Sequence, residues 1–184
     1  KNPWIANRLL VFHIITLFLS MFILGILYQI ILREFITESK LLSFTHFDND
    51  LFSLIKNNLY VFTNCFLLAL FFRAGGLMLV LAWNAAHWSG SITLIAYNLL
   101  TPQVEKSLFT LFAIFPHLIL EVSADILAGL AGTFLSIAFL KYSIISNKLL
   151  RVVMASATLL IVGFFLCILA AFVEINLAQK VLSF

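Results

Sequence analysis

Three ionisable side chains recur at four-residue intervals inside one long hydrophobic segment of the chain. They are His117, Glu121 and Asp125, and an α-helix places residues at this spacing on one face. The same row continues with three small residues, Ala128, Gly132 and Ser136. A charged side chain at membrane depth costs about 2.5–3.5 kcal/mol on the mildest scale. We therefore expect this polar face to point toward other helices or toward a wet cavity.

The pair formed by His117 and Glu121 has the composition of several different sites. Imidazole and carboxylate are both ligands of divalent metals such as zinc, so a helical turn that carries both is a workable half-site. In a dry environment the same two groups also form a hydrogen bond, which can lock helices together or hold a proton or an ion. Asp125 lies one turn further along. The spacing leaves open a structural polar network, a proton or ion site, and a metal or catalytic site.

A second group of polar residues lies in the segment 83–91. Asn84, His87 and Ser91 are separated by three and four residues, so they can share a helix face. We expect Asn84 to hold the His/Glu row through interhelical hydrogen bonds, each worth about 1 kcal/mol. In a catalytic site the same amide would orient the reacting groups.

The last hydrophobic segment ends in a third candidate, Glu174, which follows a row of small residues. It either closes the cluster from the opposite side or lies at the water boundary. Arg73 could neutralise one of the acids. The candidates for the metal are His117, Glu121 and Glu174. The predicted polar network as a whole comprises Asn58, Asn64, Arg73, Asn84, His87, His117, Glu121, Asp125 and Glu174.

The composition is that of an integral membrane protein. The chain has 184 residues, of which 63% are hydrophobic and 10% charged, and its mean hydropathy is +1.12; soluble domains are about half apolar and a quarter charged. One composition regime predicts a single membrane domain over 1–184. The basic residues are scattered between hydrophobic runs, so we expect no nucleic-acid partner. Cys65 and Cys167 lie within these runs and are expected to be buried free thiols. The chain begins at Lys1, so we expect a preceding segment to be missing from it.

Five hydrophobic segments, each about long enough to cross a membrane as a helix, predict an all-α bundle of about five transmembrane helices. A span needs about 20 apolar residues. The candidate spans are 9–32, 58–73, 77–99, 108–140 and 152–173. The glycine pair at 75–76 marks a break between the second and third spans, because glycine weakens a helix and permits a tight turn. The fourth segment is too long for one straight crossing, so we expect a broken helix near Pro116, where the segment either kinks or splits in two.

The charges between the spans predict the orientation. The loop 141–151 holds three basic residues and no acid, which places it in the cytoplasm. The segment 33–57 is polar, partly amphipathic and richer in acids, so we expect it to be extracytoplasmic. Within it, Asp50 is placed to cap a helix that begins at Leu51. Five crossings then put the N-terminus inside, the C-terminus outside and the His/Glu cluster in the outer half of the membrane.

Several short elements together carry a family resemblance. They are Asn57-Asn58, the glycine pair, Trp83-Asn84, Gly90, Phe115-Pro116-His117, Leu120-Glu121, Ala128-Gly129, Gly132, and Ala170-Ala171 with Glu174. This pattern resembles the stage II sporulation protein M family of integral membrane proteins over about residues 10–180, and its most specific part is the Pro-His…Leu-Glu element. The chain departs from the family at Leu118, where glycine is usual, and at Val122, where proline is frequent.

The resemblance implies a multi-pass protein of a bacterial or archaeal cytoplasmic membrane. In spore formers the named member anchors cell-wall hydrolases during engulfment, so the resemblance favours a scaffold for envelope-remodelling partners. Two alternatives use the same polar row: an intramembrane metal-dependent hydrolase in which Asn84 orients His117, Glu121 and Glu174, and a proton-coupled transporter. The expected partners are the lipid bilayer and membrane or envelope proteins. Small-residue faces are also compatible with a homo-oligomer.

Overall fold

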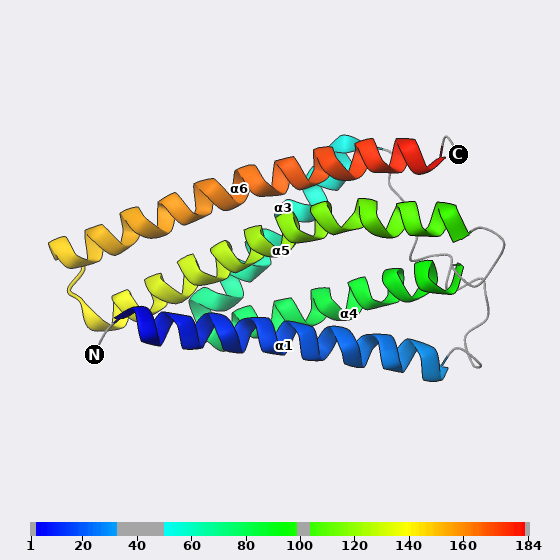
Figure 1. Ribbon diagram of the computed structural model, residues 1–184. Coiled ribbons are helices and arrows are strands. Elements are labelled where there is room, and N and C mark those ends of the chain that lie inside the picture. The colour runs from blue at the N-terminus through cyan, green and yellow to red at the C-terminus, as the bar shows by residue number, and fades with distance from the viewer. Residues whose placement is uncertain (1–2, 33–49, 99–103, 183–184) are drawn as a thin grey trace.

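The computed structural model describes residues 3–32, 50–98 and 104–182 of the chain, and every regular element within these ranges is an α-helix. The helices are α1 (Pro3–Leu32), α3 (Leu51–Phe72), α4 (Ala74–Asn98), α5 (Val104–Lys141) and α6 (Asn147–Leu182). They run up and down in an elongated bundle, with the two termini at opposite ends (Figure 1). The predicted all-α membrane bundle is confirmed.

Three of the helices are long and apolar enough to cross a membrane. These stretches are Leu51–Phe72, Phe115–Lys141 and Asn147–Asn176. Shorter apolar stretches cover Ile15–Tyr28 in α1 and Ala74–Ala86 in α4, counted over the described residues. The protein is therefore membrane-embedded, and a fivefold crossing stays a prediction.

Helix α5 is the centre of the bundle. It packs against α3, α4 and α6, whereas α1 packs on α4 at the periphery. Half of an 18-residue apolar window of α5 is buried within the protein (50%), compared with 17% of the corresponding window of α6. The side chains that α5 buries are mainly small, and Ala124, Ala128 and Ala131 are fully covered. Small residues let helix backbones approach closely, which is how helices associate in lipid.

The chain reverses between α3 and α4 within a single residue. Arg73 has φ 56° and ψ −137°, a conformation that side chains with a Cβ rarely adopt. The amide nitrogens of Gly76 and Leu77 close the turn by donating to the Arg73 carbonyl at 3.1 and 3.4 Å. A Cβ on Gly76 would collide with the carbonyl of Leu68 on α3. The predicted break is thus present, but Gly76 permits the close packing of α4 on α3 while Arg73 makes the turn.

Replacing Arg73 by glycine is expected to raise the free energy of unfolding by about 1 kcal/mol, because glycine adopts this backbone conformation without a steric penalty. Thermal unfolding in mild detergent would measure the change. Arg73→Lys is the matched control, since it keeps the charge and the Cβ and should leave the stability unchanged. If Arg73→Gly alone lowers the stability, the Arg73 side chain stabilises the protein by more than its unfavourable backbone conformation destabilises it.

The structure tests two predictions about helix continuity and helix capping. Pro116 lies inside α5, which continues as one helix from Val104 to Lys141, so the expected split at this proline is wrong, while a kink stays a prediction. Membrane helices tolerate proline where neighbouring helices and local adjustments satisfy the freed backbone groups, and α5 has neighbours on several sides. The predicted cap of α3 is present, because the Asp50 carboxylate accepts from the amides of Phe52 and Ser53, each at 3.3 Å.

Candidate functional site

His117 lies at the centre of a buried cluster that joins three helices. Its Nε2 atom lies 3.3 Å from Oε2 of Glu121 on α5 and 3.5 Å from Oε2 of Glu174 on α6. Its Nδ1 atom lies 3.1 Å from the carbonyl oxygen of Ala170. A carbonyl oxygen only accepts, so Nδ1 carries a proton and donates it. Nε2 then either donates to a carboxylate as part of an imidazolium, or accepts from a protonated carboxyl group.

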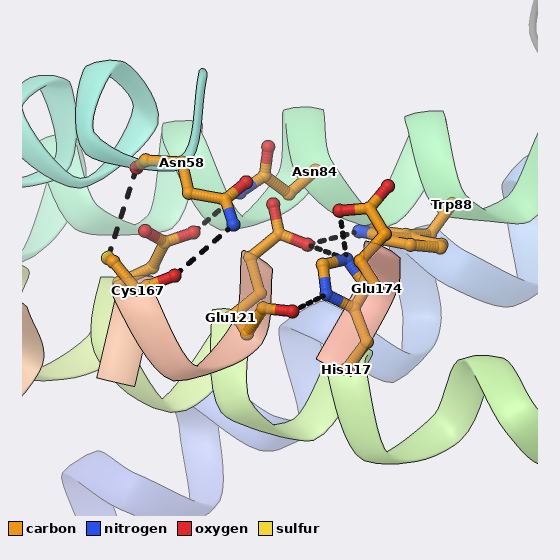
Figure 2. Close-up of polar contacts among 9 residues, drawn as sticks. Asn58, Asn84, Trp88, His117, Glu121, Cys167 and Glu174 are labelled. Atoms are coloured by element: carbon orange, nitrogen blue, oxygen red, sulfur yellow. Dashed lines mark hydrogen bonds and ion pairs between the residues drawn. The ribbon is translucent and has the colours of Figure 1, made fainter. Parts of the chain in front are cut away.

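Helix α4 completes the cluster through Trp88. The indole Nε1 donates to Oε2 of Glu121 at 3.1 Å, so this carboxylate oxygen faces both the indole and the imidazole. The rings of Trp88 and His117 are in contact, with centroids 5.2 Å apart. Figure 2 shows these side chains converging between the helices. We name Trp88, His117, Glu121 and Glu174 the His/Glu cluster.

The side chains of the His/Glu cluster are largely shielded from both water and lipid. The side chains of His117 and Glu121 are 4% and 9% exposed, and that of Glu174 is 19% exposed. In such an environment charges interact far more strongly than in water, and an unpaired one is costly. The four-residue spacing of the sequence thus correctly places the imidazole against Glu121, and Glu174 closes the cluster from α6.

A second polar pair lies one turn deeper. Asn84 on α4 donates from Nδ2 to Oδ2 of Asp125 on α5 at 2.7 Å, and Asp125 is only 1% exposed. The thiol of Cys65 on α3 faces the same carboxyl group. Oδ1 of Asp125 has no hydrogen-bond partner of standard geometry among the described residues. The predicted contact of Asn84 with the polar row is therefore made, but to Asp125 and not to His117 or Glu121.

Replacing Asn84 by alanine is expected to lower the free energy of unfolding by about 1 kcal/mol, since an interhelical hydrogen bond to a buried carboxyl group is lost. Thermal unfolding in detergent would detect the loss. The control is the double replacement of Asn84 and Asp125 by leucine, which removes both partners and should cost less than leaving the carboxyl group alone. A double variant that is no more stable than Asn84→Ala would contradict this account.

Asn58 ties α3 to α6 near the same level. Its Nδ2 atom donates to the carbonyl of Cys167 at 3.5 Å, while the Cys167 thiol lies 4.0 Å from the Asn58 carbonyl. Asn58 is 3% exposed. Cys65 and Cys167 are both buried free thiols, as predicted.

Two predicted members of the network are not brought into it, and a third is not described. Arg73 is exposed in the α3–α4 turn, and no ion pair joins it to an acid among the described residues. Asn64 is half-buried, and none of the hydrogen bonds found in this part of the chain joins it to the cluster. The side chain of His87 lies outside the described residues.

Sequence reasoning missed two participants. Trp88 was assigned no role, although it follows Asn84 by four residues and therefore shares its helix face. The carbonyl of Ala170 carries no signal in the sequence, because any residue would supply it. Within the described ranges no three His, Cys, Asp or Glu residues are arranged to hold a metal ion, and the metal candidates stay predictions.

Comparison with known proteins identifies a family for the chain. No curated protein and no solved structure matches the chain. A family described as Stage II sporulation protein M matches residues 14–179, a range that contains all members of the His/Glu cluster. Since this match spans most of its length, the chain belongs to the stage II sporulation protein M family.

Proposed function

We propose that the protein is a multi-pass scaffold of a bacterial or archaeal cytoplasmic membrane, which anchors envelope-remodelling partner proteins. One observation carries the proposal: the polar groups of the His/Glu cluster engage one another across three helices. Both ring nitrogens of His117 face protein oxygens, and Glu121 also accepts from Trp88. Such a network is suited to holding α4, α5 and α6 in one arrangement.

The position of the cluster supports this role. The groups that it joins come from α4, α5 and α6. One turn deeper the Asn84–Asp125 bond joins α4 to α5 again, and the Asn58–Cys167 contact adds α3. Lipid offers helices no hydrophobic driving force for association, so packing and polar contacts of this kind must fix their arrangement. A rigid bundle presents its loops to partners in a constant geometry.

The test replaces Glu121 by glutamine in cells that depend on the protein. The amide oxygen of glutamine, in the place of Oε2, can still accept from Trp88 and from a protonated Nε2 of His117, but the ionisable group is gone. A scaffold should retain its cellular level and its partners in the membrane fraction, measured by quantitative proteomics. A zinc-dependent hydrolase or a proton-coupled transporter would lose function at a normal protein level, and that result would overturn the proposal.

Glu121→Ala provides the matched control. Alanine leaves the Trp88 indole and the imidazole without their shared acceptor, so the bundle should loosen and the protein level should fall. The partners should then be lost from the membrane fraction only in the variant whose own level falls, Glu121→Ala, and not in Glu121→Gln, although both lack the charge at position 121.

A further inference from the structure

Two adjoining grooves run along α3 on the outer surface of the bundle. The first, of about 550 Å³, is lined by Ser53, Lys56, Asn57, Leu59, Tyr60 and Thr63. The second, of about 480 Å³, lies between α3 and α6 and is lined by Phe62, Thr63, Phe66, Leu160, Ile161, Phe164 and Phe165. Thr63 lines both, so the two grooves adjoin.

The character of the surface changes along this path. The end near the start of α3 presents the ammonium group of Lys56, the amide of Asn57 and the phenol of Tyr60, which are all exposed. The other end is made almost entirely of aromatic and aliphatic side chains from α3 and α6. We propose that this polar-to-apolar surface binds one anionic phospholipid, with the phosphate at Lys56 and an acyl chain between α3 and α6.

The dimensions fit one leaflet. From Ser53 to Phe66 the helix rises about 20 Å, and half of a bilayer with its headgroups is also about 20 Å thick. Lys56 lies near the start of the apolar stretch Leu51–Phe72, where a lysine can reach the headgroup level. Tyrosine is favoured at the same level. On the orientation expected from the loop charges, this end lies in the outer leaflet.

The charges around Lys56 favour an anionic occupant. Among the described residues no carboxylate forms an ion pair with its ammonium group. The nearest acid along the helix, Asp50, directs its carboxylate at the amides of Phe52 and Ser53 as the helix cap. A phosphate would complement the ammonium group, and the Asn57 amide can add a hydrogen bond.

Native mass spectrometry of the full chain in mild detergent tests the proposal with two lipids of identical chains, dioleoylphosphatidylglycerol and dioleoylphosphatidylcholine. The anionic lipid should be retained about fivefold better, as expected for one lysine at a headgroup. Lys56→Gln should abolish this preference and Lys56→Arg should keep it. Lys148→Gln is the matched control, because Lys148 is also exposed but lies at the start of α6 at the other end of the bundle.

A second variant tests the apolar end independently. Phe165 is 64% exposed and lines the acyl groove, so Phe165→Ala should weaken retention of both lipids while the preference for the anionic one remains. Glycerol 3-phosphate, which has the phosphate but no chain, should not compete. Equal retention of both lipids by the wild-type chain would identify ordinary annular lipid and overturn the proposal. So would a preference that survives in Lys56→Gln.

Discussion

Replacing His117 by alanine is expected to lower the free energy of unfolding by about 3–5 kcal/mol, the cost typical of removing one partner from a buried ion pair. The imidazole separates two acids, and it lies 3.3 Å from Glu121 and 3.5 Å from Glu174. Without it two carboxyl groups face each other across a cavity, and the Ala170 carbonyl loses its donor. Thermal unfolding in mild detergent, followed by circular dichroism, would measure the loss.

Two further variants isolate the cause of this effect. Ile119 lies on the same helix but is 61% exposed, so Ile119→Ala should change the stability by less than about 0.5 kcal/mol. Adding Glu121→Gln and Glu174→Gln to the His117→Ala chain should restore part of the stability, because it removes the acids that face the cavity. A triple variant less stable than His117→Ala would show that the loss arises from packing and not from charge.

Replacing Gly132 by valine is expected to destabilise the bundle by about 3 kcal/mol, at the upper end of the cost of overpacking a core. A Cβ at this position would overlap the carbonyl oxygen of Phe66 and lie 2.9 Å from the backbone nitrogen of Leu70, both on α3. Backbone atoms cannot turn aside as a side chain can, so α3 and α5 must move apart. The interhelical contacts at their crossing would be lost together.

Gly75 is the matched control for this prediction. It is exposed in α4, and a Cβ there would meet nothing within 4 Å. Gly75→Ala should therefore be neutral or raise the stability by about 0.5–1 kcal/mol, because alanine is the better helix former. Equal losses at Gly132 and Gly75 in thermal unfolding would show that helix propensity, and not the α3–α5 contact, sets the result.

Periodicity was sufficient to predict which residues of the site share a helix face. The row of His117, Glu121 and Asp125 does face the protein interior, since all three are buried. Spacing within one helix cannot say which neighbour each residue meets, because the rotation and depth of the other helices are set by packing. For that reason the sequence could not decide whether Glu174 joins the cluster or lies at the water boundary. It also could not say which residue of the row Asn84 contacts.

The two helix breaks illustrate the same limit. A proline and a glycine pair both weaken a helix locally, and the sequence predicted a break at each. The proline is tolerated within α5, which is supported by neighbouring helices, while the reversal falls on Arg73 and not on a glycine. The position of the turn follows from the close contact of Gly76 with the Leu68 carbonyl. This contact joins two helices, so the residues next to the turn do not by themselves predict where the chain reverses.

The one-residue reversal at Arg73 also bears on how the protein is made. Arg73 alone separates Phe72 from Ala74, so we expect α3 and α4 to behave as one helical hairpin during insertion. A helical pair satisfies most of its backbone hydrogen bonds internally, and here the turn pairs the amides of Gly76 and Leu77 with the Arg73 carbonyl, so the pair can enter lipid as one body. During biosynthesis α3 and α4 should therefore insert into the membrane together, as a preformed helical pair against which α5 and α6 pack later.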